Sequence, residues 1–502
     1  MSCFLILPVI AAPPTNRIQF SLSQILKMNS NCCEIIDNDI EGRIVIATRD
    51  IAQGELVGQE KAILRNPPTK TKPLCLGCYR SLSTENHIRC QTCQWPMCSE
   101  ECCLSPDHLL ECSMHQKSGF QMHIPYEDIE PYYIAILPLR MLALKQSDPQ
   151  KWQELIKLMS HLESWKIQEH FMVDHQLAVE FILDHFSIAD ITEDFILQLF
   201  GIAYVNDFLA VVKDVKIRLC CPKLAMLSHD CTPNVIRCTD ESKSVIRCYA
   251  SRPIQRGQKL SHSYIDLFLP SLIRRDLLLK SKHFICKCMK CQDPTELGTH
   301  GSSVRCSNCF QTLVNPPSWQ CPQCNYITNG EKILFHCYQE SQSLLQSVSK
   351  RTVQAYEDFI TKYEGVLHPQ NFLLIRVKYM LVSFYGRLKG FEVQDIARDR
   401  AMLERKKELG LEVLNVLEFS EPGFSSAKGV IFYELHCPYF IEGNLDGNMK
   451  CLEESVKHLE EAVRHLKFKN DENTFGHKLL ISALSTLLKL KAVLGKKAEG
   501  HE

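Results

Sequence analysis

A lone cysteine, a tyrosine and a cysteine triplet follow one another in the middle of the chain. Cys231 ends a Ser-His-Asp-Cys block, Tyr264 ends a Leu-Ser-His-Ser-Tyr segment, and the triplet has the spacing Cys286-x-Cys288-x2-Cys291. Structural zinc is held by four ligands in a tetrahedron, so three thiolates leave one position that Cys231 can fill. A closed site of this kind would join three distant pieces of the chain and place the triplet over the segment that holds Tyr264.

Further pairs of potential zinc ligands lie on both sides of this region. Eight ligands in four pairs are enough for two tetrahedral sites, and two Cys-x2-Cys pairs separated by eleven residues have the spacing of a zinc ribbon. Chance clustering of cysteines is the alternative interpretation. With the site above, the sequence predicts about four zinc ions per chain. The ligands are Cys75, Cys78, Cys90, Cys93, Cys98, Cys102, His108 and Cys112, then Cys231, Cys286, Cys288 and Cys291, then Cys306, Cys309, Cys321 and Cys324.

The composition is that of a chain with several folded units in a reducing compartment. The 502 residues exceed what one hydrophobic core accommodates. A hydrophobic fraction of 45% and a charged fraction of 23% are ordinary for a globular protein, and the net charge of −1 gives no general attraction to nucleic acid or anionic membranes. The 26 cysteines, with their Cys-x2-Cys pairs, indicate zinc rather than disulfides. Cysteines outside the ligand groups are expected to be small buried side chains: Cys3, Cys32, Cys33, Cys220, Cys221, Cys238 and Cys248 among them.

The first residues are apolar but lack the features of a secretion signal. No positive charge precedes Arg17, and the apolar run from Cys3 to Ala12 is too short to cross a bilayer. Met28 is an alternative start, in which case residues 1–27 would be dispensable. We expect residues 1–33 to be an unstructured extension, and the protein to be located in the nucleus, the cytoplasm or both, where zinc thiolates stay reduced.

The hydrophobic pattern predicts strands near the N-terminus and helices elsewhere. Residues 34–65 alternate apolar and polar positions around Gly42 and Gly54, which predicts short strands joined by turns. Residues 120–200 are predicted to be helical, as is the chain from residue 331 onward. For the helical face from Leu155 to Trp165, core packing is the main interpretation and a peptide groove is the alternative. The predicted buried faces are Leu155, Leu158, Met159, Leu162 and Trp165; Val456, Leu459, Val463 and Leu466; and Leu479, Leu480, Leu484, Leu487 and Leu488.

The blocks described so far resemble the SET and MYND domain-containing (SMYD) family of protein-lysine methyltransferases, in particular its arthropod-type branch. The SET motifs of that family are an Asn-His-Ser-Cys-x-Pro-Asn block, a tyrosine segment and a Cys-x-Cys-x2-Cys tail, and all three have counterparts between Ser228 and Cys291. The resemblance implies an α+β fold. In it a SET-domain β-fold carries an inserted MYND zinc finger and a helical insertion, followed by a zinc-bound post-SET tail and a C-terminal TPR-like helical domain.

The implied domains follow in order along the chain. The N-terminal part of SET covers 34–74, the MYND finger 75–112, the helical insertion 113–200, the SET core 201–266, the post-SET tail 267–295, the zinc ribbon 300–328 and the helical domain 331–495. In the family the finger's ligands interleave, so that the first and third pairs hold one ion and the second and fourth pairs hold the other. A structural clip is the main interpretation of the ribbon, and a protein-docking element is the alternative. The helical domain has no strict 34-residue repeat.

The resemblance also assigns roles to single residues. Tyr264 would be catalytic and would orient the substrate amine and the methyl group, whereas a core-packed strand tyrosine is the alternative. Asn234 would stabilise the crossing of loops that forms the fold's pseudoknot, and Phe284 would stack on the adenine. Residues expected to contact S-adenosylmethionine are Gly42, Arg43, Asn206, Ser228, His229 and Phe284.

Methyl transfer to lysine needs a neutral amine, although lysine has a pKa near 10.4 in water. Desolvation in a narrow channel and the charge of the sulfonium both favour loss of the proton. Alignment of amine, methyl and sulfur could contribute on the order of 7–11 kcal/mol. The residues around such a channel therefore need to exclude water and to hold the amine in place.

Three residues depart from the family's pattern close to this site. Ile44 stands where a second glycine usually lies, and Ser228 replaces an asparagine, which loses one amide group. Lys282 occupies the place of a second tyrosine, four residues before Cys286. An aromatic wall attracts cationic amines, whereas a lysine would repel the substrate ammonium.

The leading hypothesis is an S-adenosylmethionine-dependent protein-lysine N-methyltransferase, with histone or non-histone substrates and a part in regulating gene expression. The second is a catalytically weak or inactive adaptor, a co-repressor scaffold that recruits protein partners. A nucleic-acid-binding zinc protein is the weakest hypothesis, because acidic residues outnumber basic ones in the finger and its thiolates outweigh two zinc ions. We expect the finger to bind peptide partners, and the protein to be a monomer with no membrane segment.

Overall fold

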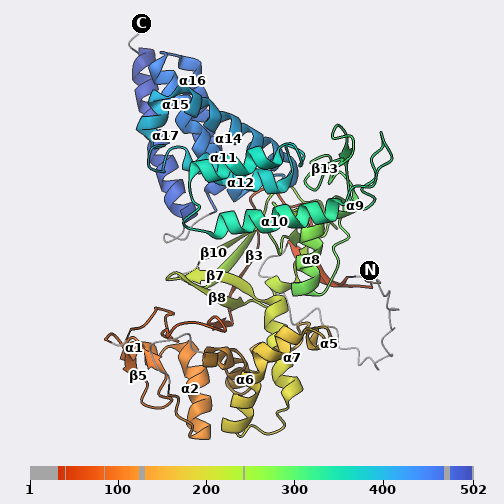
Figure 1. The fold of residues 1–502 in the computed structure, drawn as a ribbon. Coiled ribbons are helices and arrows are strands. Elements are labelled where there is room, and N and C mark those ends of the chain that lie inside the picture. The colour runs from red at the N-terminus through yellow and green to blue at the C-terminus, as the bar shows by residue number, and fades with distance from the viewer. Residues whose placement is uncertain are drawn as a thin grey trace.

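The structure is a computed structural model that describes residues 32–499 except residues 40, 84, 124–130, 241–242 and 469–474. The expected extension at residues 1–33 lies outside the described residues except at its end, where Cys33 already begins the first strand. A group of small β-sheets occupies the middle of the molecule. The finger and the insertion helices lie on one side of these sheets and the C-terminal helices on the other (Figure 1).

Three small antiparallel sheets form most of the β part. The first is a hairpin of β1 (Cys33–Asn38) and β2 (Gly42–Ala47), and Gly42 has a φ of 73°, a left-handed conformation that favours glycine. The second sheet has the order β10-β11-β3 and the third β4-β8-β7. The strands expected in residues 34–65 are thus present, with Val45 and Val57 in the core. The other strands are β3 (Leu56–Lys61), β4 (Leu64–Asn66), β7 (Phe208–Val212), β8 (Val215–Cys220), β10 (Val235–Asp240) and β11 (Val245–Ala250).

The finger inserted after β4 contains two short strands, β5 (Ile88–Arg89) and β6 (Pro96–Met97), and two helices, α1 (Glu100–Cys103) and α2 (Pro106–Ser118). Each helix begins with a serine cap. The side chain of Ser99 accepts a hydrogen bond from the Cys102 backbone, and that of Ser105 accepts one from the His108 backbone. Both caps therefore fix the backbone of a predicted zinc ligand.

The insertion is helical, as expected, but its predicted apolar face is divided between two helices. Leu155 lies on α4, whereas Trp165 lies on α5, and residues 157–161 between them form a loop. The prediction was wrong for Met159, which is 59% exposed on this loop. The insertion consists of the 3-10 helix η2 (Pro131–Ala135), α3 (Ile136–Ser147), α4 (Pro149–Ile156), α5 (Leu162–Lys166), α6 (Glu169–His185) and α7 (Glu193–Asn206).

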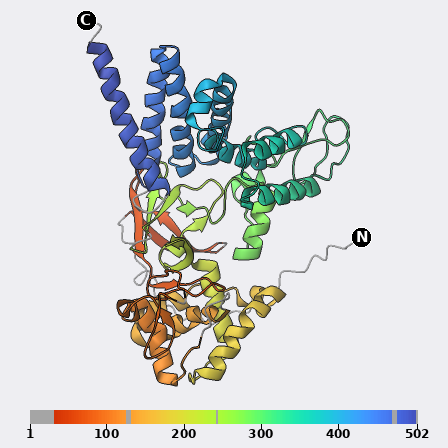
Figure 2. The same cartoon turned by 60° about the vertical axis from the view of Figure 1, so that its left-hand side comes forward.

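After the β core the chain forms α8 (Ser271–Lys282) and α9 (Met289–Gln292), then a ribbon with β13 (Val304–Arg305) and β14 (Leu313–Val314). The remaining helices pack on one another, and α17 is at the outer edge of this group (Figure 2). They are α10 (Gly330–Gln346), α11 (Val353–Tyr363), α12 (Phe372–Phe384), α13 (Val393–Arg398), α14 (Arg400–Ser420), α15 (Ser426–Leu445), α16 (Met449–Leu466) and α17 (Phe475–Glu499).

The predicted face of α16 is confirmed, because Leu459 and Leu466 are fully buried. The predicted face of α17 is confirmed only in part. Leu479 and Leu480 are buried, but Leu488 is 70% exposed, because this outer helix is covered on one side only. None of the helices in the described part of the chain is both long and apolar enough to span a bilayer.

Among the contacts between the C-terminal helices and the rest of the chain, two lie at separate places. In the first, the Phe424 backbone N–H donates to the Ser251 carbonyl at 2.7 Å, and the rings of Phe424 and Phe468 pack near Tyr249. In the second, the ribbon joins the segment before α12, where the Arg305 N–H donates to the Val366 carbonyl at 2.8 Å. These two contacts position the helical domain relative to the β core.

Candidate functional site

Two strands that are distant in the sequence cross beside Tyr264. β9 (Ser228–His229) and β12 (Ser261–His262) pair in parallel. The buried side chain of Asn234 fixes the crossing: its Nδ2 donates to the Lys259 carbonyl at 2.8 Å, and its Oδ1 accepts from the Ser261 N–H at 2.9 Å. The bracing role implied for Asn234 thus agrees with its contacts.

Cys231 lies two residues after the end of β9 and meets the cysteine triplet. The ligand atoms of Cys231, Cys286, Cys288 and Cys291 all lie within 4.8 Å of one another, and the Sγ atoms of Cys231 and Cys291 are 3.6 Å apart. Four sulfurs at about 2.3 Å from a tetrahedral zinc would be about 3.8 Å apart, so the donor set fits this ion. The guanidinium of Arg274 lies 3.6 Å from the Cys291 Sγ and places a positive charge beside the thiolates.

Tyr264 lies under this group of cysteines with both of its polar groups engaged. Its hydroxyl donates to the Leu227 carbonyl at 2.6 Å, and its backbone N–H donates to Nδ1 of His229 at 3.1 Å. The ring lies 4.9 Å from the His262 ring and 6.4 Å from the Phe284 ring. Burial raises the pKa of the hydroxyl, so it stays protonated near neutral pH and can act as a hydrogen-bond donor.

Two of the predicted cofactor residues hold the same loop. Arg43 donates from Nη2 to the Lys157 carbonyl at 2.8 Å, and Asn206 donates from Nδ2 to the Met159 carbonyl at 2.8 Å. The loop of residues 157–161 therefore forms part of the site, although its sequence gave no signal of this. Its last residue, His161, has a φ of 52° and faces the ring of His283 at 5.2 Å.

The other predicted cofactor residues lie nearby. His229 has both ring nitrogens engaged within the protein, because Nε2 is 3.4 Å from the Cys231 Sγ while Nδ1 meets Tyr264. Its backbone and its ring face are what remain for a ligand. Phe284 is half-buried, with its ring 6.0 Å from that of His229, and Ser228 forms the neighbouring edge of β9.

The residues present fit an adenosyl cofactor on two observations. A Cβ added to Gly42 would meet nothing within 4 Å, so the backbone at this turn lies beside open space. The Nε2 of His283 is buried, and among the described residues no group forms a hydrogen bond with it. An orphaned polar atom beside the rings of Trp165 and His161 suits a ligand with both a flat ring and polar edges.

The three departures from the family pattern lie in different surroundings. Ile44 is buried, with 6% of its surface exposed, so its side chain is part of the core. Ser228 is half-buried. Lys282, the last residue of α8, donates from Nζ to the carbonyls of Tyr204 and Val205, at 3.1 and 2.5 Å.

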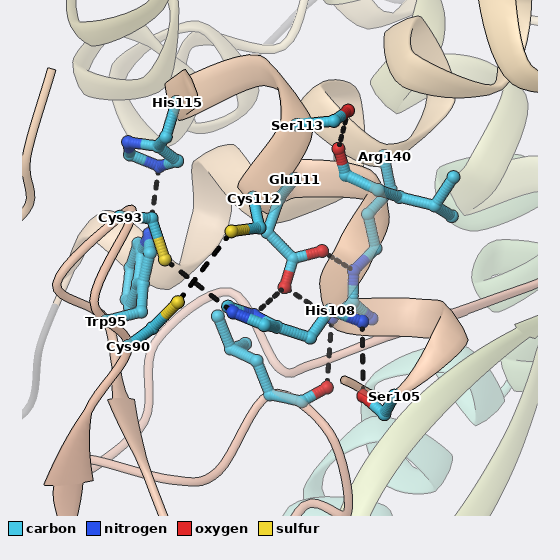
Figure 3. A network of polar contacts seen from close by, with 12 residues as sticks. Cys90, Cys93, Trp95, Ser105, His108, Glu111, Cys112, Ser113, His115 and Arg140 are labelled. Carbon is cyan, nitrogen blue, oxygen red and sulfur yellow. Dashed lines mark hydrogen bonds and ion pairs between the residues drawn. The ribbon is translucent and has the colours of Figure 1, made fainter. Parts of the chain in front are cut away.

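The finger brings its eight predicted ligands together in two groups, in the interleaved order. Cys75, Cys78, Cys98 and Cys102 form one group and Cys90, Cys93, His108 and Cys112 form the other, each with its ligand atoms within 4.8 Å. In the second group the Cys90 and Cys112 sulfurs are 3.7 Å apart, and the Cys93 sulfur is 3.6 Å from Nε2 of His108 (Figure 3). Both donor sets are typical of structural zinc.

A buried network holds His108 in place (Figure 3). Its Nδ1 lies 3.0 Å from Glu111, which Arg140 of α3 contacts through Nε at 2.6 Å and through Nη2 at 2.9 Å. Burial alone would raise the pKa of Glu111, but the charge of Arg140 and its hydrogen bonds outweigh burial and lower it. The carboxylate therefore stays ionised and fixes Nε2 as the metal-binding nitrogen of His108.

The ribbon forms the fourth group, in which Cys306, Cys309, Cys321 and Cys324 converge. The sulfurs of Cys306 and Cys324 are 3.6 Å apart, and those of Cys309 and Cys321 are 3.7 Å apart. All sixteen predicted ligands thus fall into the four predicted groups. Of the cysteines outside these groups, Cys32, Cys33, Cys220, Cys221, Cys238 and Cys248 are buried as expected, and Cys3 lies outside the described residues.

Comparison with known proteins identifies a SET domain in this chain. Residues 42–265 match the model of the SET domain. The SET domain-containing protein SmydA-8, isoform B, of Drosophila melanogaster is 27% identical over 408 residues, which cover 77% of this chain and 87% of that protein. N-lysine methyltransferase SMYD2-B of Danio rerio is 28% identical over 244 residues, 47% of this chain and 51% of that protein.

Two further matches are more distant or shorter. Human N-lysine methyltransferase SMYD2 is 27% identical over 216 residues, 41% of this chain and 45% of that protein. A crystal structure of the SET domain of LSMT bound to lysine and AdoHcy aligns over 85% of this chain and 90% of that chain, at 11% identity and a TM-score of 0.31, which is too low to support a structural argument. The chain thus contains a SET domain and is similar to SMYD proteins of Drosophila and of vertebrates.

Proposed function

We propose that this protein is an S-adenosylmethionine-dependent protein-lysine N-methyltransferase. The observation that carries the proposal is the convergence of the β9–β12 crossing, Tyr264 and the Cys231 zinc group within a matched SET domain. The lysine methyltransferases among its relatives support the same reaction. They do not favour the alternative of an inactive adaptor.

The chain's own residues would exclude water and orient the reacting amine. The cofactor, when bound, supplies an activated methyl group on a sulfonium. Arg43, Asn206, the 157–161 loop and Phe284 would hold it, and Tyr264 would direct the lysine amine toward it. Burial of Tyr264 and of the rings around it provides the dry surroundings in which a lysine amine loses its proton more readily.

A cavity beside this site offers room for a substrate polypeptide. It has a volume of about 1140 Å³ and is lined by residues of α5, α6, α7, α8, α10 and α12, among them Trp165, Phe171, Tyr204, Tyr338 and Arg376. Trp165 Nε1 and Arg376 Nη1 are buried donors, and neither has a hydrogen-bond partner among the described residues. Such donors suit the carbonyl oxygens of an extended chain, and the cavity joins the insertion, the post-SET helix and the helical domain.

The reaction is tested by two measurements on the same protein. Calorimetric titration with S-adenosylmethionine should show binding, and core histones or a denatured total-protein extract should accept labelled methyl groups. Tyr264→Phe removes the hydroxyl and should lower kcat by about 10²-fold, because the amine loses its orientation. Cofactor affinity should remain at the wild-type value in this variant.

If the protein binds no S-adenosylmethionine at millimolar concentrations, the proposed methyltransferase activity is excluded. Turnover that survives Tyr264→Phe would instead exclude the role given to this hydroxyl.

We propose three further properties. The acidic finger suits short peptide partners, which supports recruitment to other proteins and a part in regulating gene expression. Thiolate zinc groups are stable in the nucleus and cytoplasm, and we propose that the protein acts there as a monomer. Fluorescent tagging in cells and light scattering of the pure protein test these two points.

A further inference from the structure

The ammonium of Lys282 lies beside Tyr264 and has well-defined partners. Its Nζ donates to the carbonyls of Tyr204 and Val205, at 3.1 and 2.5 Å, and lies 5.7 Å from the centre of the Tyr264 ring. These two carbonyls directly precede Asn206, one of the predicted cofactor residues. Lys282 thus reaches the wall between the cofactor region and the tyrosine.

A subsite for an alkylammonium needs the elements that surround this Nζ. Carbonyl oxygens accept the N–H donors of the ammonium, and an aromatic ring face attracts its charge. Here two backbone carbonyls and the Tyr264 ring provide both. Because a lysine of the chain already occupies these groups, a second cation could use them only after the first has moved or lost its charge.

We propose that Lys282 determines acceptor specificity by occupying the acceptor-amine subsite with its own ammonium, so that a substrate lysine binds only when it displaces Lys282. This inference rests on the proposed function for the identity of the acceptor. The consequence is a low affinity for simple alkylammonium groups. A substrate must therefore gain most of its binding energy from contacts outside the subsite, which favours a polypeptide over a free amine.

The surroundings allow Lys282 to leave without unfolding its helix. Lys282 is the last residue of α8, and Cys286 of the zinc group follows four residues later. The side chain can therefore rotate away while the helix stays in place. Asp207 supplies a place for the displaced charge. Both of its carboxylate oxygens are buried, and the thiol of Cys220 and the charge of Arg218 act on the carboxylate. Burial raises the pKa of Asp207 to about 6, which the positive charges of Arg218 and Lys282 oppose.

The charge of Lys282 itself changes at moderately alkaline pH. Burial lowers its pKa to about 8, with Arg218 and Arg237 acting in the same direction and Asp207 opposing them. The other titratable groups near Lys282 change charge outside this pH range. The pKa is about 3 for His262 and about 4 for His283, both lowered mainly by burial, and that of Tyr264 is raised by burial. Between pH 7 and 9, Lys282 is therefore the group of this set that titrates.

The test measures binding of n-butylammonium chloride to the full-length zinc-loaded protein, by calorimetry at pH 7 and without cofactor. Lys282→Met keeps the length of the side chain and removes its charge, so the subsite becomes free. Affinity for n-butylammonium should rise by at least about tenfold, because a like charge no longer competes. The matched control is Lys280→Met, which removes an exposed lysine of the same helix and should bind the probe as the wild type does.

Two further measurements make the result independent of folding and of catalysis. Lys282→Gln keeps a donor for the carbonyls without the charge and should give an intermediate affinity, and unfolding temperatures identify a variant that has lost its fold. In the wild type, affinity for the probe should rise from pH 7 to pH 9, because n-butylammonium stays charged while Lys282 loses its proton. In Lys282→Met it should stay constant.

If both Lys282 variants fold and bind the probe no better than the wild type, the proposal is wrong. A gain in probe affinity without methyl transfer by any form would keep the alkylammonium subsite occupied by Lys282 and reject the proposed function.

Discussion

Arg140 connects three parts of the chain through a single buried guanidinium. It contacts Glu111 of the finger, the hydroxyl of Tyr79 at 2.7 Å and the carbonyl of Arg65 in β4. Because burial of an arginine is costly unless its donors are paired, these contacts depend on one another. The geometry of the second zinc group is therefore coupled to the position of α3, and through it to the helical insertion.

This coupling predicts an effect of Glu111→Gln on zinc binding. The amide cannot hold the His108 Nδ1–H as a carboxylate does and leaves Arg140 without its counter-charge, so the second ion of the finger should bind about 10- to 100-fold more weakly. Competition with a chelating dye measures this loss. Glu100→Gln, an exposed change on α1, is the matched control. Equal zinc retention in both variants would contradict the coupling.

At the scale of elements, the site depends on how closely α7 approaches the 157–161 loop. Gly201 of α7 lies where an added Cβ would be 2.4 Å from the carbonyl oxygen of Ser160, closer than any real contact. The same loop is held by Arg43 and Asn206, so its position sets theirs. A glycine inside this helix is thus explained by packing against a backbone group that cannot move freely.

Gly201→Ala should displace the loop and weaken the cofactor site. We expect a loss of about 1–3 kcal/mol in unfolding free energy, as for other overpacked positions, together with weaker S-adenosylmethionine binding. Chemical denaturation and calorimetry measure the two effects. Gly365→Ala provides the control, because a Cβ there would meet nothing within 4 Å. Unchanged cofactor binding in a destabilised Gly201→Ala protein would show that the loop does not shape the site.

At the scale of the whole molecule, the start of the ribbon contacts the segment that leads into α12. Besides the Arg305 contact, the His368 N–H donates to the Ser303 carbonyl at 3.2 Å, and the Asn371 Nδ2 donates to the same carbonyl at 3.1 Å. Val304 and Leu367 are fully buried where the segments meet. The helical domain is thereby fixed at the end that borders the cavity.

Loss of the ribbon's zinc should loosen this end and leave the β core intact. Cys309→Ser should reduce the zinc content from about four ions per chain to about three. Amide hydrogen exchange should become faster in residues 301–305 and 366–372, with no change in β1 to β3. Cys451→Ser, outside all four groups, is the control and should retain every ion. Faster exchange throughout the chain would mean that the ribbon stabilises the whole fold.

The sequence by itself predicted the four groups of candidate zinc ligands, the short strands and the SET domain. Ligand pairs such as Cys306-x2-Cys309 can be read locally, because a short turn brings both sulfurs to one ion whatever surrounds them. Helical faces were predicted well where the helix is continuous, as in α16, and less well where a loop interrupts the pattern at Met159 or where α17 is covered on one side.

Only the tertiary structure decided how these pieces form a site. The attachment of residues 157–161 to Arg43 and Asn206, and of Lys282 to the carbonyls of Tyr204 and Val205, uses backbone oxygens, which every residue has and no sequence pattern marks. The Arg140 network likewise joins residues far apart in the chain. Contacts of this kind follow from long-range packing. The identity of a side chain shows that it can form such a contact, but it does not show with which partner.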